Sequence, residues 1–266
     1  MPTEVGTAPG HVLPHALRDG LPTRVAGRPL ALFLDYDGTL CPIVTRPEDA
    51  VLDEAMRHTL QGLIERHVTA VVSGRELNDL RRRVDLPGLH YAGNHGFEIE
   101  GASPALRCEV GGEFVDEIGS AAATLRRLAG RIEGALVEHK RYSVSVHFRL
   151  VPSDQVKAVE VAVTQTLADH PRLRLNAGKK LFELRPALDW HKGKATRWLL
   201  DRLSEERSDL LPIFIGDDVT DEDAFRELSD DGIGILVSDT VRSTSARYWL
   251  RDVDEVRQLL AALSAR

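Results

Sequence analysis

Short apolar runs alternate along the chain with segments of helical periodicity. The runs that we predict to be strands are 30–35, 68–74, 89–96, 211–218 and 232–237. Between them, apolar residues recur at helical spacing in 53–66 and 75–84. This alternation predicts a Rossmann-like, doubly wound parallel sheet with helices on both faces.

The middle third of the chain has a different pattern and predicts an inserted α+β domain at 98–185. Its segment 142–150 alternates polar and apolar residues, which is typical of a sheet with one face in water. Helix candidates at 113–130 and 153–169 accompany it, and 172–186 predicts a hairpin around its Asn-Ala-Gly sequence. These elements suffice for a small domain of their own.

The segments on either side of the insertion, 29–97 and 186–266, are then the two halves of the parallel-sheet core. Pro, Gly and Thr punctuate the first 28 residues. We expect residues 1–28 to be a loosely ordered leader.

Composition and charge limit the classes of partner. The chain is 42% hydrophobic and 28% charged, as in an ordinary globular protein, and its formal net charge is -7. An acidic balance argues against nucleic acid or an anionic membrane as the main partner. Two cysteines, Cys41 and Cys108, and the lack of a long apolar segment favour a cytoplasmic protein. The oligomeric state stays open.

Polar side chains stand where several predicted strands end. Asp35, Ser73, Asn94 with His95, and Asp217 each follow an apolar run. Ligands of open parallel sheets bind at the carboxyl ends of the strands. These residues are therefore expected to share one site.

Asp35 and Asp37 are the first pair of interest at this edge. A single aspartate after a strand is more often a helix cap or a turn residue. Two carboxylates at i and i+2 of an extended stretch project to the same side and repel unless a cation or a shared proton relieves them. Gly38 and Thr39 then suit a turn whose backbone approaches an anion.

A second acidic group lies in GDDVTDEDAF at 216–225. An acidic first helical turn explains one or two of its five acids, because they favour the helix dipole. Carboxylates from two separate strand ends suit a hard divalent cation such as Mg²⁺.

Lys192 and Ser73 are candidates for binding an anion. A cation beside a nucleophilic carboxylate suits attack on phosphorus, which also needs positive charge on the phosphoryl oxygens. Lys192 opens a helical pattern and Ser73 precedes Gly74 at a helix start. A solvated surface lysine and an ordinary serine cap are the alternative interpretations.

Four ordered motifs resemble the haloacid dehalogenase-like phosphatase superfamily: DYDGT, the Ser of VVSGR, the Lys of HKGKA, and GDDVTDED. The resemblance implies that Asp35 is the nucleophile and that Asp37 is the general acid and then the general base. Ser73 and Lys192 would hold the phosphoryl oxygens. Mg²⁺ would lie between the Asp35 side chain, the Asp37 backbone carbonyl and Asp217.

The fourth motif also implies supporting acidic roles for Asp218 and Asp221. Dehalogenase-type members of the superfamily lack the second aspartate of the first motif, and P-type ATPases have Thr there. Asp37 therefore favours a phosphatase over a long-lived phosphoenzyme.

Longer stretches resemble the trehalose-6-phosphate phosphatases over roughly residues 29–260. They are YAGNHGFEIEG, VEHKRYSVSVHFR and GKKLFELRPALDWHKGKA. In that family the inserted domain is a mobile cap that recognises the sugar. The implied substrate-binding residues are Gly38, Thr39, Gly74, Arg75, Asn94 and His95 in the core, and Lys140, His147, Arg149 and Glu183 in the cap. Alternation places His147 and Arg149 on one strand face, although a merely solvated polar face is the alternative for both.

The resemblance implies Mg²⁺-dependent hydrolysis of trehalose 6-phosphate through an aspartyl-phosphate, as a step of trehalose biosynthesis. Two alternatives remain. One is a sugar phosphatase with the same cap type that acts on sucrose 6-phosphate or mannosyl-3-phosphoglycerate. The other is a non-catalytic sugar-phosphate sensor, which the Asp35–Asp37 pair disfavours because a sensor needs no nucleophile.

Overall fold

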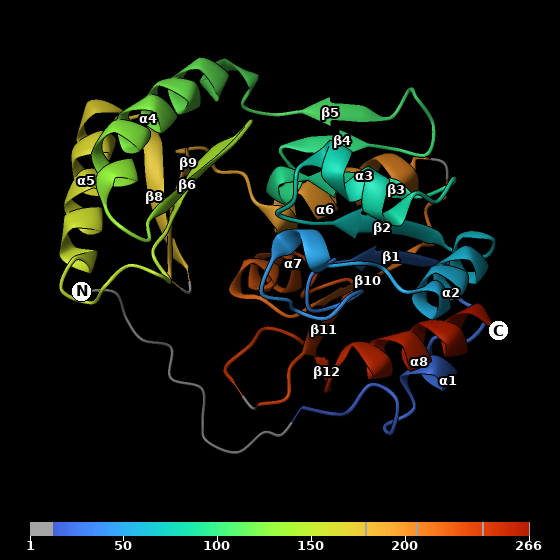
Figure 1. The fold of residues 1–266 in the computed structure, drawn as a ribbon. Coiled ribbons are helices and arrows are strands. Elements are labelled where there is room, and N and C mark those ends of the chain that lie inside the picture. Colours follow the sequence, from blue (N-terminus) through green and yellow to red (C-terminus); the bar gives the residue numbers. More distant parts are fainter. Residues whose placement is uncertain (1–12, 179, 206, 241, 266) are drawn as a thin grey trace. The chain divides into compact units, whose positions relative to one another are not determined.

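The computed structural model describes residues 13–178, 180–205, 207–240 and 242–265. They divide into two compact units, which Figure 1 shows as ribbons. The first unit contains the described residues up to Cys108 and from Trp190 onward, and the second is Glu109–Asp189. Each unit has hydrophobic core of its own.

The first unit is built on an eight-stranded sheet in the order β12-β11-β10-β1-β2-β3-β4-β5. From β12 to β3 the neighbouring strands pair in parallel, and β4 is antiparallel to β3. The strands are β1 Leu30–Leu34, β2 Val68–Val72, β3 His90–Gly93, β4 Glu98–Glu100, β5 Arg107–Glu109, β10 Leu211–Gly216, β11 Ile233–Val237 and β12 Tyr248–Leu250. The predicted parallel-sheet core is confirmed.

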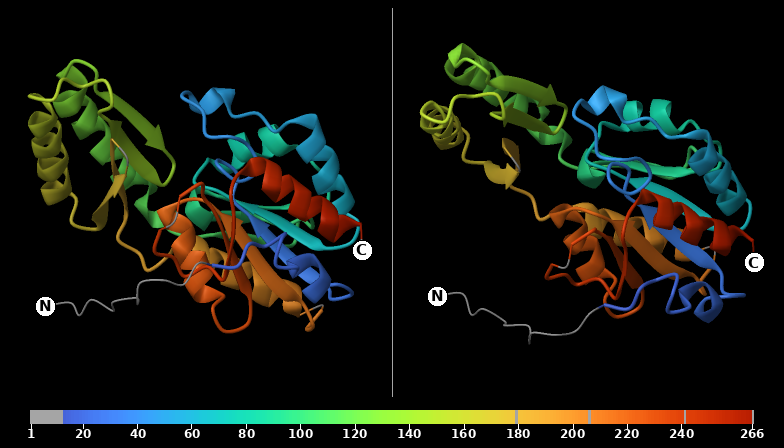
Figure 2. Two further views of the ribbon diagram at one scale, coloured as in Figure 1. Left: turned by 90° about the horizontal axis from the view of Figure 1, so that it is seen from below. Right: turned by 60° about the horizontal axis from the view of Figure 1, so that its bottom comes forward.

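Helices cover both faces of this sheet. They are α1 Leu21–Arg24, α2 Glu54–Ile64, α3 Leu77–Val84, α6 Lys192–Ser204, α7 Glu222–Glu227 and α8 Val253–Ser264. Leu30, Leu32 and Leu34 of β1 pack with residues of α2, α3 and α8. Ala31 and Phe33 pack in a second core with α6 and α7. Figure 2 shows α8, in red, beside α2, which it contacts. Because β1 is buried on both faces, its sequence is apolar throughout, and its chemistry can only follow the strand.

The second unit is a four-stranded antiparallel sheet in the order β6-β7-β9-β8 with two helices on one face. Its elements are α4 Val115–Leu128, β6 Leu136–Lys140, β7 Ser143–His147, α5 Val156–Asp169, β8 Leu173–Gly178 and β9 Leu181–Pro186. Val144 and Val146 of β7 turn to the helices, and Ser143 and Ser145 turn to the opposite face. Short 3₁₀ turns in the chain are Pro47–Asp49, Asn94–Gly96, Gly112–Phe114, Ala129–Arg131 and Val219–Asp221.

The prediction of a loosely ordered leader is wrong for residues 13–28. Ala16, Leu21 and Val25 are buried in the first unit's core. His15 forms a parallel bridge with Trp249 of β12. These three buried residues, spread over ten positions, are too few for a clear periodicity, so the sequence pattern did not reveal this packing. Residues 1–12 of the predicted leader lie outside the described residues.

The boundaries of the inserted domain also differ from those that the sequence predicted. The sequence analysis placed it at 98–185, whereas the second unit is Glu109–Asp189. The stretch from Glu98 to Glu100 stays with the first unit because it forms β4 and pairs with β3. The hairpin is formed by β8 and β9, with Gly178 opposite Leu181, so its strands continue past the turn position we predicted.

Candidate active site

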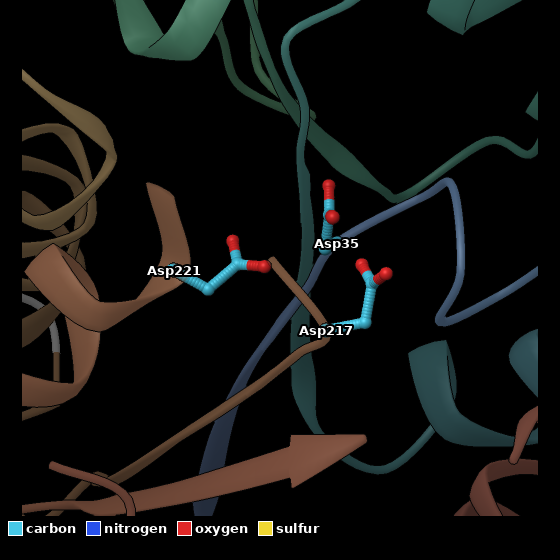
Figure 3. Close-up of side chains that lie close together, drawn as sticks. All are labelled: Asp35, Asp217 and Asp221. Carbon is cyan, nitrogen blue, oxygen red and sulfur yellow. The ribbon is translucent and has the colours of Figure 1, made fainter. Parts of the chain in front are cut away.

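Two aspartates follow neighbouring parallel strands and meet at the carboxyl edge of the first unit's sheet. The backbone N–H of Asp35 donates to the carbonyl of Ile215 in β10 at 2.9 Å, so Asp35 continues the pairing of β1. Asp217 follows the end of β10. Figure 3 shows their carboxyl groups close to that of Asp221. One oxygen from each of the three aspartates lies within 4.8 Å of the others.

Lys192, the first residue of α6, joins Asp35 to Asp221. Its Nζ lies 2.9 Å from Asp35 Oδ1 and 2.8 Å from Asp221 Oδ1. All three side chains are buried. The second oxygen of Asp221 accepts the backbone N–H of Asp218 at 2.9 Å, in a reciprocal cap of the 3₁₀ turn. Both oxygens of Asp221 are therefore engaged within the protein.

Burial and like charges shift the pKa values of this group. Burial raises the pKa of Asp35 well above its usual value, the charges of Asp221 and Asp217 raise it further, and Lys192 opposes them. Burial, followed by the charge of Asp221, raises the pKa of Asp217 to about 7. Burial alone would lower the pKa of Lys192, but Asp221 and Asp35 outweigh it and keep the lysine protonated. The ammonium group of Lys192 therefore does not fully compensate the negative charge of the carboxylates around it.

The donor set fits a divalent cation. Three negative carboxylates against one ammonium leave an excess of two negative charges when all are ionised. Oδ1 of Asp217 is buried and accepts no hydrogen bond from the described residues. A hard cation prefers such oxygen ligands, and its charge would relieve the repulsion that raises their pKa values.

Asp37 has a different partner, because its side chain forms a bidentate ion pair with Arg75. Arg75 Nε donates to Asp37 Oδ2 and Nη2 donates to Oδ1, both at 2.7 Å. Arg75 also donates to Asp79 Oδ2 at 3.1 Å and to the carbonyl of Pro47 at 2.9 Å. Its guanidinium lies 5.3 Å from the ring centre of Tyr36. Arg75, which the sequence analysis assigned to substrate, thus has most of its donors engaged within the protein.

The turn after Asp37 brings its backbone close to Asp217, one of the three clustered aspartates. Gly38 has a φ of 80°, and a Cβ at this position would overlap the carboxylate of Asp217. Its N–H donates to the carbonyl of Cys41 at 2.8 Å and closes the turn. Thr39 is fully buried, and its Oγ1 has no hydrogen-bond partner among the described residues. Only glycine therefore permits this approach of the turn to Asp217.

Ser73 and the Asn94–Gly96 turn lie together beside this edge. Ser73 is buried at the end of β2, and its Oγ accepts the backbone N–H two residues further on at 3.2 Å. A Cβ on Gly74 would lie 2.7 Å from the ring of His95, so the ring packs on this glycine. Asn94 and His95 have positive φ angles of 51° and 57°. The amide of Asn94 donates to Glu98 Oε2 at 2.6 Å, so its side chain is held by the protein.

Three of the four predicted cap residues share one face of the second unit's sheet. Strand pairing places Lys140, His147 and Glu183 on the face opposite Val144 and Val146. Glu183 is buried, and Lys140 and His147 are partly exposed. The face was expected to be wet, but Ser143 and Ser145 on it are also buried, at 6% and 2% exposure.

Arg149 does not lie on this face, so that prediction is wrong. β7 ends at His147. The N–H of Val151 donates to the carbonyl of Phe148, which turns the chain away from the strand direction. Arg149 stands exposed in this turn. The alternation of side chains that links positions two apart applies only while the backbone stays extended.

Comparisons with known proteins agree with this geometry. Residues 33–254 match the family described as Trehalose-phosphatase. The chain is 43% identical over 249 residues to probable trehalose-phosphate phosphatase D of Arabidopsis thaliana, across 89% of this chain and 68% of that protein. It is 41% identical over 254 residues to trehalose 6-phosphate phosphatase RA3 of Zea mays, across 90% and 70%. The chain belongs to the trehalose-phosphatase family.

The fold of this trehalose-phosphatase is also similar to a solved structure, the C-terminal domain of the C. albicans trehalose-6-phosphate phosphatase. The TM-score is 0.79, with 20% sequence identity, and the likeness covers 96% of this chain and 99% of that structure. It supports the architecture described above. No helix in the described ranges is both long and apolar enough to cross a membrane.

Sequence reasoning missed three charged residues of this trehalose-phosphatase. In the second unit, Arg185 Nε donates to Glu183 Oε2 at 2.5 Å, and Glu138 Oε2 lies 2.8 Å from His147 Nε2. Arg185 and Glu138 lie on the same polar face of the sheet as Glu183 and His147. The alternation in LFELRP could have revealed Arg185. In the first unit, Arg242 Nη2 donates to the carbonyl of Asp217 at 2.9 Å. No pattern around Arg242 signals this contact.

Proposed function

We propose that this chain is a phosphatase that hydrolyses trehalose 6-phosphate to trehalose and inorganic phosphate, with a phosphoaspartyl intermediate on Asp35. Membership of the trehalose-phosphatase family supports the substrate. The observation that carries the chemistry is the buried Asp35 carboxylate, held 2.9 Å from the ammonium of Lys192 at the carboxyl edge of the sheet. A buried, ion-paired carboxylate at a ligand-binding edge has the form of a nucleophile rather than of a surface cap.

Two displacements account for the reaction. In the first, an oxygen of Asp35 bonds to phosphorus while the bond from phosphorus to the sugar oxygen breaks, and the sugar oxygen takes a proton from Asp37. In the second, Asp37 takes a proton from water as the water oxygen bonds to phosphorus. The bond to Asp35 then breaks and phosphate leaves. This route splits one difficult displacement into two easier ones.

Lys192 and Ser73 are proposed to hold the phosphoryl oxygens. Lys192 remains protonated because the neighbouring carboxylates outweigh the effect of burial on its pKa. It would exchange part of its contact with Asp35 for the phosphoryl group as that oxygen becomes esterified. Positive charge placed beforehand at this position stabilises the charge of the transition state.

Asp37 must change partners during this cycle. Both of its oxygens accept hydrogen bonds from Arg75. The ionised form suits the second step, in which Asp37 accepts a proton. We propose that Arg75 positions Asp37 and that Asp37 leaves this pair when it donates a proton to the sugar oxygen.

Mg²⁺ is the cation that we propose for the acidic cluster, with the side chains of Asp35 and Asp217 and the backbone carbonyl of Asp37 as its ligands. Asp218 and Asp221 support it from the fourth motif, since both Asp221 oxygens already serve Lys192 and Asp218. The bound cation would offset the charge of the carboxylates and of the phosphoryl group.

The second unit is proposed to act as a cap that selects the sugar. Its polar sheet face presents Lys140, His147 and Glu183, which offer both donors and acceptors for sugar hydroxyl groups. A site that pairs with substrate hydroxyl groups discriminates strongly, because a wrong sugar leaves buried polar groups without partners. Closure of the cap over bound substrate, proposed by analogy with the family, would exclude water from the phosphoryl transfer.

A panel of sugar phosphates tests the substrate. We expect phosphate release from trehalose 6-phosphate to exceed that from sucrose 6-phosphate and mannosyl-3-phosphoglycerate by at least ~100-fold in kcat/KM, the range that hydroxyl recognition supplies. Equal rates on all three would leave a general sugar phosphatase. Binding without turnover of any of them would support a sensor instead.

We further propose that the enzyme works in the cytoplasm on this small sugar phosphate, without nucleic acid or membrane as partners. Both cysteines are free thiols, as a reducing compartment favours, and the net charge is -7.

A further inference from the structure

A cavity lies at the edge of the first unit's sheet opposite the catalytic edge. Its volume is about 280 Å³. Leu30, the first residue of β1, and His67, which precedes β2, line it together with Leu263 near the end of α8. Asp35 follows the other end of β1. The cavity is therefore a different site from the one that performs the chemistry.

Three arginines line this cavity: Arg28, Arg66 and Arg207. None of the described lining residues is acidic. Within the described part of the chain, Arg28 and Arg66 form no ion pair, and Arg207 pairs only with Asp209 at 3.1 Å, outside the lining. The chain as a whole carries a net charge of -7, whereas the residues that line this cavity carry a positive net charge.

His67 lines the same cavity as an uncharged ring. Its Nε2 lies 3.3 Å from the carbonyl of Leu263, so Nε2 carries the hydrogen. Burial lowers the pKa of His67, and the charges of Arg66 and Arg207 lower it further. The positive charge of the cavity comes from the arginines alone.

A simpler explanation exists for each arginine taken separately. α1 ends at Arg24, α2 at Ile64 and α6 at Ser204, so the three arginines follow helix ends. Cations near helix C-termini are stabilising because they offset the helix dipole. That effect needs no common cavity and no exclusion of acids from its lining. The convergence of the three arginines therefore calls for a further cause.

We propose that this cavity binds a phosphate-class dianion, either free inorganic phosphate or the phosphate group of a small monoester. Guanidinium groups match phosphate oxygens with paired hydrogen bonds. The three arginines are exposed, so the site is weak and sensitive to salt, with a dissociation constant on the order of millimolar. The proposal does not depend on the identity of the substrate or on turnover.

Thermal unfolding with inorganic phosphate tests this proposal. The cavity variant is Arg66→Ala with Arg207→Ala. The matched control is Arg126→Ala with Arg127→Ala, which removes two arginines from the last turn of α4. The Mg²⁺-loaded proteins are titrated with phosphate against sodium chloride at equal ionic strength. The catalytic site contributes equally in all three proteins.

We expect the phosphate-dependent rise in Tm to be smaller in the cavity variant and unchanged in the control. A cavity variant that is less stable without phosphate but gains as much from it as wild type would show that the arginines only support helix ends, and would overturn the proposal.

A second measurement covers the case in which the double variant does not fold. Equilibrium dialysis with labelled phosphate should count two sites per wild-type chain. In Arg28→Ala, whose change lies in an exposed loop, one site should weaken at least tenfold. A single site in wild type would overturn the proposal. Glucose 6-phosphate as competitor separates the two sources. Displacement of the cavity phosphate identifies a monoester site, and its persistence identifies a site for the free ion.

Discussion

The catalytic edge and the polar cap face deliver their side chains in opposite ways. At the catalytic edge, Asp35 and Asp217 each follow a strand that is apolar on both faces. On the cap face, Lys140, His147 and Glu183 lie within strands and alternate with core residues. The first arrangement depends on where strands end, and the second depends on which way each residue of a strand points.

This difference matches the two tasks that we propose for the enzyme. Strand ends are fixed by the parallel sheet, so the groups proposed to act on phosphorus are held by the backbone of the core. A strand face can exchange its side chains without disturbing the opposite face. If the proposed roles hold, phosphoryl chemistry can stay constant while the sugar preference changes by substitution on the cap face.

The largest expected effect comes from removing Asp35, the proposed nucleophile. Asp35→Asn should lower kcat for trehalose 6-phosphate by at least ~10⁴-fold, because no carboxylate remains to form the covalent intermediate. Its Tm should stay within a few degrees of wild type, since the change relieves repulsion from Asp221 and Asp217.

Phosphate release and thermal unfolding measure the two quantities, with the exposed Asp230→Asn as control. Turnover of Asp35→Asn near the wild-type rate would show that Asp35 is not the nucleophile. The proposed contrast between the catalytic edge and the polar cap face would then fail.

Much of the catalytic edge could be predicted from the sequence because strand ends leave a local signal. The apolar run LALFL before Asp35 and LPIFIG before Asp217 identify both strands without tertiary information. The parallel order that makes them neighbours follows from the alternation of strands and helices. The fold class was accordingly predicted correctly.

Other features depended on contacts that no local pattern encodes. The sequence did not show that Arg75 pairs with Asp37, because the two lie 38 positions apart and their pairing is a tertiary event. It placed Arg149 on a strand that ends two residues earlier. It also overlooked the packing of Leu21 and Val25, whose partners come from the far end of the chain.

Arg75 should give the next largest effect. Arg75→Ala is expected to lower kcat for trehalose 6-phosphate by about 10³-fold, within the range of general acid–base catalysis, since Asp37 loses its bidentate partner. The loss should be at least tenfold smaller for p-nitrophenyl phosphate, whose leaving group needs little protonation. Arg75→Lys keeps the charge without the fork and should give an intermediate rate.

Steady-state kinetics on both substrates measure this split, and Arg82→Ala is the control because Arg82 is exposed and, among the described residues, pairs only with Asp79, at 3.6 Å. Equal losses on the two substrates would show that Arg75 supports the fold or the phosphate rather than Asp37.

Glu183 tests the cap face by itself. Glu183→Gln should lower kcat/KM for trehalose 6-phosphate by roughly 100-fold, because a buried acceptor that pairs with Arg185 and is proposed to meet the sugar becomes an amide. Its rate on p-nitrophenyl phosphate should not change. Glu160→Gln on α5 is the control, since the Glu160 side chain forms an exposed ion pair with Lys157 and with no other described residue. A parallel loss on p-nitrophenyl phosphate would assign Glu183 to stability instead of specificity.

Two glycines with the same backbone conformation can sharpen the account of the edge. Gly38 and Gly20 have φ angles of 80° and 75°, but a Cβ meets the carboxylate of Asp217 only at Gly38. Gly20→Ala should lower the free energy of unfolding by ~1–2 kcal/mol, the cost of a left-handed residue, and leave activity unchanged.

Gly38→Ala should cause a similar loss of stability. It should also lower kcat about tenfold and weaken Mg²⁺ binding, because Asp217 must move. Urea unfolding, kinetics and metal titration compare the two variants. Equal behaviour would mean that the turn can shift without disturbing Asp217.

The smallest expected effect is a difference in the pH dependence of stability between the two regions. The pKa of Asp217 is raised from 3.8 to about 7, so the folded protein without metal binds a proton more readily than the unfolded chain does. Its contribution to stability is complete below pH 3.8 and is lost as the pH rises through about 7. On the cap face the hydrogen bond from His147 lowers the pKa of Glu138, so that contribution has the opposite sign and is lost as the pH falls.

Thermal unfolding in EDTA and in Mg²⁺ from pH 5 to 8 separates these contributions. The rise in Tm on adding Mg²⁺ should grow by a few degrees over this range, since the cation competes with the proton for Asp217. Asp217→Asn should flatten that increase, whereas Asp209→Asn on the surface should leave it intact. If the rise in Tm on adding Mg²⁺ is the same at every pH in wild type, the cation does not bind at Asp217. The negative charge of the acidic edge would then need another partner.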